Sequence, residues 1–183
     1  MALERVPREL FLPPRARQLA YQNRPLAIGW GQTCSQPEMV GVMVAALLPL
    51  SGARVLEVGA GSGYMAAVLR AAGALEVVTL ELIPELAATA RRNLSRAGVG
   101  RVEVRCQGGR RGAPDRAPYQ AVVISAAATT VPEALLGQVA EGGAVLVPLG
   151  GPEEQELVRL RRGGDGEWQR EGLGPCRFVP LMD

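Results

Sequence analysis

The chain has no histidine and no lysine, so all 20 of its basic residues are arginine. Histidine is the usual general base and the usual zinc ligand, and its absence excludes every Ser-His and Cys-His catalytic pair. The absence of lysine excludes a P-loop lysine and a Schiff-base mechanism. Any chemistry carried out by this protein therefore needs neither side chain.

The chain also has few cysteines, a small net charge and no long apolar run. Cys34, Cys106 and Cys176 are far apart without CxxC spacing, which favours reduced thiols over a disulfide framework or a metal site. The formal net charge of +2 is too small to indicate a nucleic-acid or membrane partner. No run is long enough to span a bilayer, and the charged first twenty residues lack a signal peptide's apolar region. We expect a cytoplasmic monomer without a metal ion.

From residue 54 onward, short apolar runs alternate with helical periods, which predicts crossover units and a mainly parallel sheet. Residues 163–166, Gly-Gly-Asp-Gly, predict a hairpin turn before the last strand. The expected fold is α/β, doubly wound, with a mainly parallel seven-stranded sheet and an antiparallel edge hairpin. The predicted strands are Arg54–Val58, Glu76–Glu81, Val102–Cys106, Gln120–Ser125, Ala144–Pro148, Glu156–Arg161 and Arg177–Leu181, and the predicted helices are Glu38–Leu48, Gly63–Ala72, Pro84–Ala97 and Val131–Val139.

A glycine-rich loop follows the first of these strands. Glu57–Tyr64 reads EVGAGSGY, with glycines at 59, 61 and 63 between a strand and a helix. Glycine lets the backbone turn sharply and approach a ligand closely, and a helix N-terminus offers free N–H groups. A tight turn that binds nothing is the alternative interpretation.

Two acidic residues favour a ligand site. Glu57 precedes the loop, and Glu81 ends the next strand about twenty residues later, where an acid bonds ribose hydroxyls. This arrangement resembles the cofactor site of class I S-adenosylmethionine-dependent methyltransferases, of Rossmann-like type. The resemblance implies that the cofactor's amino-acid end lies against Gly59–Gly63 and its ribose against Glu81. A nicotinamide enzyme is disfavoured, because the spacing is GxGxG instead of GxGxxG and no proton-relay residue is evident.

A second motif narrows the resemblance. Gly31–Val40 reads GQTCSQPEMV, which Gly and Pro interrupt too often for an ordinary helix or strand. We expect a loop that presents polar side chains. The chain resembles the protein-L-isoaspartate O-methyltransferase family over nearly its whole length. The segments that carry the resemblance are VPRELFLPP (6–14), LAYQNRPLAIGWGQTCSQPEMV (19–40), EVGAGSGYMAAVL (57–69), APYQAVVISAAATTVPEALLGQVAEGGAVLVPLG (117–150) and RFVPL (177–181).

This resemblance implies methyl transfer from S-adenosylmethionine to the carboxylate of L-isoaspartyl residues in damaged proteins and peptides. A carboxylate is already ionised at pH 7, so the reaction needs positioning and no strong base. The resemblance makes Ser35 the catalytic hydroxyl and implies substrate contacts from Ser35, Ala126, Arg177 and Val179. The cofactor-binding residues that it implies are Gln32, Thr33, Cys34, Glu57, Gly59, Ala60, Gly61, Ser62, Gly63, Glu81, Leu82, Gln107 and Gly108.

The expected organisation is one domain over residues 1–183. Residues 1–50, interrupted by six prolines, predict an irregular lead-in with one or two helices and the active-site loop. Residues 51–150 predict the cofactor-binding core, and residues 151–183 the C-terminal edge strands.

Several alternatives stay open. Thr33 and Ser35 are also good N-cap residues for the helix after Pro37. For Arg177, an exposed charge at a strand end is favoured over a substrate contact. The protein is alternatively a catalytically weak or noncatalytic relative that binds S-adenosylmethionine or a protein partner. A third alternative is a related O-methyltransferase for another carboxylate or a hydroxyl group, with carboxylates favoured because the chain lacks a base.

One departure from the family generates a test. The family usually has GDG after the third strand, and here Gly108 replaces the Asp that accepts a hydrogen bond from the adenine amino group. Gly108→Asp restores a charged acceptor and should strengthen cofactor binding by about 1–3 kcal/mol, measured by calorimetry. Unchanged affinity would mean that this loop is wrongly aligned.

Overall fold

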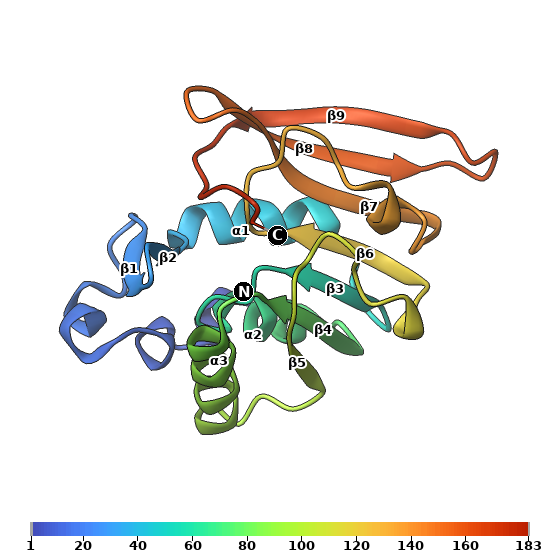
Figure 1. Cartoon of the computed structure of the whole chain (residues 1–183). Helices are drawn as coiled ribbons and strands as arrows, with labels where there is room; N and C mark the ends of the chain where they lie inside the picture. The colour runs from blue at the N-terminus through green and yellow to red at the C-terminus, as the bar shows by residue number, and fades with distance from the viewer. Residues whose placement is uncertain (1, 183) are drawn as a thin grey trace.

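The computed structural model describes residues 2–182 and contains a seven-stranded sheet (Figure 1). The strands lie in the order β5-β4-β3-β6-β7-β8-β9, and β8 runs antiparallel to both of its neighbours. The predicted fold class is confirmed. The bounds are β3 Arg54–Val58, β4 Glu76–Glu81, β5 Val102–Cys106, β6 Tyr119–Ile124, β7 Val139–Gly150, β8 Gln155–Arg162 and β9 Trp168–Pro175.

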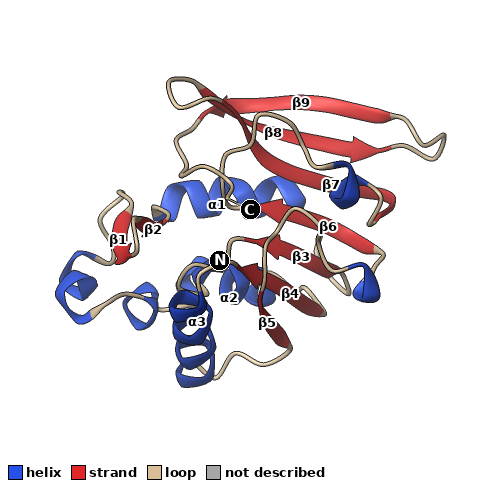
Figure 2. Cartoon of the chain, viewed as in Figure 1, coloured by secondary structure: helices blue, strands red, loops and turns tan. Residues whose placement is uncertain are grey.

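Side chains alternate between the two faces of the sheet, as the period of two in a strand requires. On one face, Val55 packs in the core beneath α1 (Pro37–Leu47) and α2 (Tyr64–Ala71), and α3 (Pro84–Arg96) contributes Leu94. On the other face, Leu56 and Val58 pack with residues around Tyr119 and with the short helix α4 (Glu133–Leu136). Figure 2 shows α1, α2 and α3 on one side of the sheet.

The central strand β3 is parallel to both β4 and β6. The chain passes from β3 to β4 and β5 on one side, then returns to β6 on the other side. The connections after β3 and β6 therefore diverge, which leaves a crevice at the carboxyl ends of these strands.

The C-terminal strand differs from the prediction. Arg177–Leu181 is no strand, and β9 instead lies at Trp168–Pro175, where it forms the hairpin with β8 after residues 163–166. The apolar pattern misled the prediction because β9 is a mostly exposed edge strand with polar residues. The segment after it is held by Gln155, whose side chain bonds the backbone N–H and C=O of Phe178 at 2.7 and 3.1 Å.

Two other local predictions are wrong. The helix predicted at Val131–Val139 shrinks to α4, because Val139 already pairs with Tyr119 as the start of β7. Residues 31–40 contain no long loop. Gln32–Cys34 forms β2, which pairs with β1 (Leu26–Gly29), and α1 begins directly at Pro37.

The lead-in before β1 contains three short 3₁₀ helices, η1 (Leu3–Arg5), η2 (Arg8–Phe11) and η3 (Pro14–Leu19), and a fourth, η4 (Pro114–Arg116), precedes β6. None of the helices within residues 2–182 is long and apolar enough to cross a membrane.

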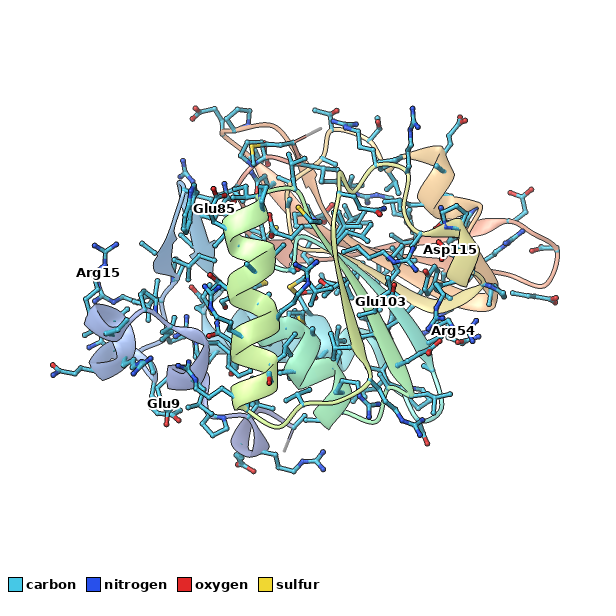
Figure 3. All side chains as sticks on the ribbon, turned by 60° about the horizontal axis from the view of Figure 1, so that its bottom comes forward. Glu9, Arg15, Arg54, Glu85, Glu103 and Asp115 are labelled. Carbon is cyan, nitrogen blue, oxygen red and sulfur yellow. The ribbon has the colours of Figure 1, made fainter. Side chains whose placement is uncertain are left out.

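An ion-pair network joins β5, the start of β4 and the segment before β6. Arg105 on β5 binds both oxygens of Asp115, at 2.6 and 2.7 Å, and also pairs with Glu103. Arg54 pairs with Glu76 at the start of β4. Figure 3 shows Arg54, Glu103 and Asp115 together, far from Glu85 at the start of α3. None of these paired residues lies at the carboxyl ends of β3 and β6, where the crevice opens.

Gly63, in the glycine loop, packs closely against Ala90 and Leu94 of α3. This contact predicts how a substitution at Gly63 changes the free energy of unfolding. The φ of Gly63 is +88°, and an added Cβ would lie 3.2 Å from Leu94 Cγ and 3.3 Å from the Ala90 carbonyl oxygen. Gly63→Ala should lower the free energy of unfolding by about 2–3 kcal/mol through strain and overpacking. Gly98→Ala is the matched control, because Gly98 has φ +67° with no atom near its Cβ position. Urea unfolding should show a smaller loss for the control, and equal losses would contradict the packing argument.

Candidate active site

A cleft lies at the carboxyl ends of the parallel strands, where the sheet topology predicts a crevice. Its walls come from the ends of β3 and β4, from the loops after β3, β5 and β6, and from the C-terminal segment. Residues 32–35, one residue of α1 and the start of α2 complete the lining. The residues that line it are Gln32, Thr33, Cys34, Ser35, Val40, Glu57, Val58, Gly59, Ala60, Gly61, Ser62, Tyr64, Met65, Leu80, Glu81, Leu82, Gln107, Gly109, Ser125, Ala126, Val179, Pro180, Leu181 and Met182.

The glycine loop, Gly59–Gly63, forms the floor of this cleft. All three glycines have positive φ (95°, 52° and 88°), which other residues adopt at a cost. The N–H groups of Gly59 and Ala60 donate to Leu80 O on β4 at 2.8 and 2.9 Å. In α3, Asn93 Nδ2 donates to Ser62 O at 3.0 Å. The loop is therefore fixed by the neighbouring strand and by a helix.

Glu81 braces the same loop. One carboxyl oxygen accepts from Gly61 N–H at 2.7 Å, and the other accepts from Ile83 N–H at 3.0 Å. Each carboxylate oxygen has two lone pairs, so Glu81 retains the capacity to accept from hydroxyl groups in the cleft. The residue thus has a structural role that the sequence did not reveal.

Glu57 is the buried acid of the cleft. It has no exposed surface, and neither of its carboxyl oxygens has a hydrogen-bond partner among residues 2–182. Burial raises the pKa of Glu57 to about 8, the Thr79 hydroxyl opposite it on β4 opposes this rise, and the charge of Glu81 adds to it. A buried acid without a partner costs free energy, so a cationic or donor group entering the cleft would be favoured here.

The β1–β2 hairpin covers one side of the glycine loop. A Cβ added at Gly61 would lie 3.3 Å from Ile28 Cδ1, so β1 packs directly above the loop. Residues 32–35 follow this contact and line the cleft. Residues 179–182, in the C-terminal segment, line another side of the cleft. Two hydrogen bonds of 2.8 Å hold this segment: Ala127 N–H donates to Val179 O, and Leu181 N–H donates to Ala127 O.

Most of the predicted site residues meet in this cleft, with three exceptions. Gly63 lies behind it at the N-cap of α2, against α3. Gly108 does not line it, whereas its neighbours Gln107 and Gly109 do. Arg177 is exposed and outside the lining, which fits the alternative of a surface charge.

Gln107 lines the cleft next to Gly108. Its Nε2 donates to Gly112 O at 2.9 Å, which directs the amide oxygen away from that carbonyl. A Cβ added at Gly109 would lie 2.2 Å from Val58 Cγ1, so this loop approaches β3 closely.

The capping alternative for Thr33 and Ser35 is wrong. Gln36 is the N-cap of α1 and its side chain forms no capping bond, whereas the N–H of Glu38 in the first turn donates to Asn23 Oδ1 at 3.2 Å. Ser35 is half-buried and Thr33 is exposed, and both line the cleft. Cys34 is buried, and burial raises the pKa of its thiol, so it behaves as a small apolar residue and not as a reactive thiol.

The sequence missed several contributors, which include Asn93, the apolar lining residues Val40, Met65 and Leu80, and the buried Tyr64, whose pKa burial raises to about 12. Apolar residues within helices carry no separate signal for a site. Among the described residues, no group of three or more His, Cys, Asp or Glu side chains is arranged to hold a metal ion.

Comparison with known proteins identifies the family. The model of the protein-L-isoaspartate(D-aspartate) O-methyltransferase (PCMT) family matches residues 1–183. The chain belongs to the PCMT family. It is 48% identical to the protein-L-isoaspartate O-methyltransferase of Methanospirillum hungatei over 182 residues, which covers 99% of this chain and 83% of that protein.

Solved PCMT structures share the fold. One protein-L-isoaspartate O-methyltransferase matches with a TM-score of 0.87 and 28% identity, over 97% of this chain and 59% of that chain. A PCMT from Plasmodium falciparum, solved in complex with S-adenosyl-L-homocysteine, matches with a TM-score of 0.84 and 22% identity, over 99% and 88% of the two chains.

The raised pKa of Glu57 predicts a pH dependence of stability. The folded protein keeps this proton up to about pH 8, whereas the unfolded chain releases it near the ordinary value of 4.5. The free energy of unfolding should therefore fall as pH rises between these values, by up to about 1.4 kcal/mol per pH unit. Glu57→Gln should remove this component in urea unfolding from pH 5 to 9. The exposed Glu85 supplies the control, Glu85→Gln, and an identical slope in wild type and Glu57→Gln would show that Glu57 is ionised throughout.

Proposed function

We propose that this protein transfers the methyl group of S-adenosylmethionine to the carboxylate of L-isoaspartyl residues in damaged proteins and peptides. The single observation that carries the proposal is the match to the PCMT family over residues 1–183. The cleft of this chain, with a braced glycine loop on one side and Gln32–Ser35 on another, supports it. We further propose that the whole chain acts as one unit around this cleft.

The residues present fit S-adenosylmethionine. The unpartnered carboxyl of Glu57 would hold the ammonium of the cofactor's amino-acid end, since a cation in contact favours the ionised form of a buried acid. Glu81 would accept from the ribose hydroxyls with its remaining lone pairs. The amide oxygen of Gln107 would accept from the adenine amino group in place of the Asp that Gly108 replaces. With this assignment, Gly108 itself makes no contact with S-adenosylmethionine.

When bound, S-adenosylmethionine supplies a methyl group on a sulfonium, and the acceptor arrives as a carboxylate. The remaining task of this chain is to place one carboxylate oxygen in line with the methyl group. Ser35, half-buried in the cleft wall, would donate its hydroxyl hydrogen to the carboxylate, while Ala126 and Val179 would border the peptide. The opposite charges of acceptor and donor neutralise one another during transfer, so water is not needed to stabilise them. Neither histidine nor lysine is required.

Radiolabelled methyl transfer to an isoaspartyl hexapeptide and to its aspartyl twin tests the function. Labelling of the isoaspartyl peptide alone would support the proposal. Labelling of both peptides would indicate a different carboxylate methyltransferase, and calorimetric binding of S-adenosylhomocysteine without labelling would indicate a noncatalytic relative.

The role of Ser35 gives a separate prediction. Ser35→Ala removes one hydrogen bond to the acceptor, so kcat should fall by about tenfold to a hundredfold, while the Kd of S-adenosylhomocysteine changes by less than about threefold. Ser95→Ala, at an exposed position of α3, is the matched control. Turnover of Ser35→Ala equal to that of the control would refute the positioning of the carboxylate by Ser35.

A further inference from the structure

Arg8 is a buried cation that the sequence analysis did not place in the site. It has no exposed surface, although it lies in the short helix η2 near the start of the chain. Its guanidinium reaches the backbone of the segment that lines the cleft. Nη2 donates to Ser35 O at 2.8 Å and to Cys34 O at 3.0 Å. The charge therefore lies directly behind the active-site segment Gln32–Ser35.

Arg8 makes three further contacts, with Ala20, Arg24 and Tyr64. Nη1 donates to Ala20 O at 2.7 Å, and Nη2 also contacts Arg24 O at 3.2 Å. The guanidinium carbon lies 5.9 Å from the ring centre of Tyr64, the first residue of α2 and part of the cleft lining. One side chain thus joins the lead-in, the chain before β1, the active-site segment and the helix that follows the glycine loop.

No acidic side chain among residues 2–182 forms an ion pair with Arg8, and its Nε has no hydrogen-bond partner there. A buried guanidinium is usually paired with a carboxylate, because removing a charge from water is costly. Here four carbonyl oxygens and one aromatic face stabilise the charge. Carbonyl groups orient their negative ends toward the cation, so the conformation of Cys34 and Ser35 depends on Arg8.

We propose that Arg8 is a positioning residue for methyl transfer: it fixes the carbonyl groups of Cys34 and Ser35 so that the Ser35 hydroxyl faces the acceptor in the cleft. Its positive charge also favours the anionic acceptor over a neutral one, since little water separates it from the cleft wall. This inference rests on the proposed function. It extends the site to a residue that touches neither cofactor nor acceptor.

The alternative is a purely structural anchor for the lead-in. Such a role would lower the stability of every variant at Arg8, but it would leave kcat and KM unchanged at temperatures where the protein is folded. A positioning role predicts a loss of turnover with cofactor affinity retained. The two roles are therefore separated by kinetics on the folded variants.

Arg8→Met and Arg8→Lys are the test variants in the full chain. Met removes the charge and all donors, whereas Lys retains the charge but lacks the planar fork that reaches several carbonyl groups. At least 10 °C below each melting midpoint, kcat for the isoaspartyl hexapeptide should fall about a hundredfold in Arg8→Met and about tenfold in Arg8→Lys. The Kd of S-adenosylhomocysteine should stay within about threefold of wild type.

Arg17→Lys is the matched control, because Arg17 is an exposed arginine of the lead-in that also donates to a backbone carbonyl, Leu12 O at 3.3 Å. Its kcat and KM should equal those of wild type. If Arg8→Met does not fold, Arg8→Lys decides the question. Values of kcat and KM within threefold of wild type in a folded Arg8 variant would overturn the proposal.

Amide hydrogen exchange provides a readout that is independent of the acceptor. With S-adenosylhomocysteine present, the fragment containing residues 32–35 should exchange at least tenfold faster in Arg8→Lys than in wild type, and residues 59–63 should be unchanged. Equal exchange of residues 32–35 would overturn the proposal. If wild type labels no isoaspartyl peptide, the proposed function fails, whereas the exchange result still decides whether Arg8 fixes this segment.

Discussion

The turn from β3 into α2 is the constraint on which the site depends. Gly59, Gly61 and Gly63 adopt positive φ, and Glu81 accepts from the N–H of Gly61 at 2.7 Å. Because the backbone lacks Cβ atoms there, β1 is able to pack above the loop through Ile28. The floor and the cover of the cleft are consequently built on the same few residues, and the strand order sets their position at the carboxyl ends of β3 and β6.

Electrostatics complement this geometry. The acid Glu57 at the end of β3 and the guanidinium of Arg8 behind Ser35 have no exposed surface and no ion-pair partner among residues 2–182, and they lie at different walls of the cleft. A cationic donor and an anionic acceptor are the reactants that such an arrangement favours. The ion pairs of Arg105 and Arg54 involve none of the residues that line the cleft. The absence of histidine and lysine is consistent with transfer to a carboxylate, because that acceptor is already ionised at pH 7 and needs no base.

The core of the fold was predictable from local pattern. The strands Arg54–Val58 and Glu76–Glu81 were predicted with the bounds that the structure has, because buried parallel strands are short apolar runs between turns. The bounds of Val102–Cys106 were also predicted, although this strand lies at one edge and is partly exposed. The opposite edge, formed by β9, was not predictable in the same way. β9 is exposed and polar, so its pairing with β8 depends on the hairpin register rather than on hydrophobicity. The N-terminal hairpin was missed because its turn uses Trp30 at φ +50° between two glycines, a combination that resembles a loop in sequence.

The sequence by itself determined the class of fold, the family and the two motifs that face each other across the cleft, because these depend on spacing along the chain. Tertiary structure alone decided which residues meet. In the folded chain, Arg177 and Gly108 do not line the cleft, and Glu81 accepts a hydrogen bond from the glycine loop. Arg8, 27 residues before Ser35 in the sequence, donates to the Ser35 carbonyl oxygen. Such contacts join residues that no local pattern relates, and they form because buried polar groups must find partners wherever the packed chain places them.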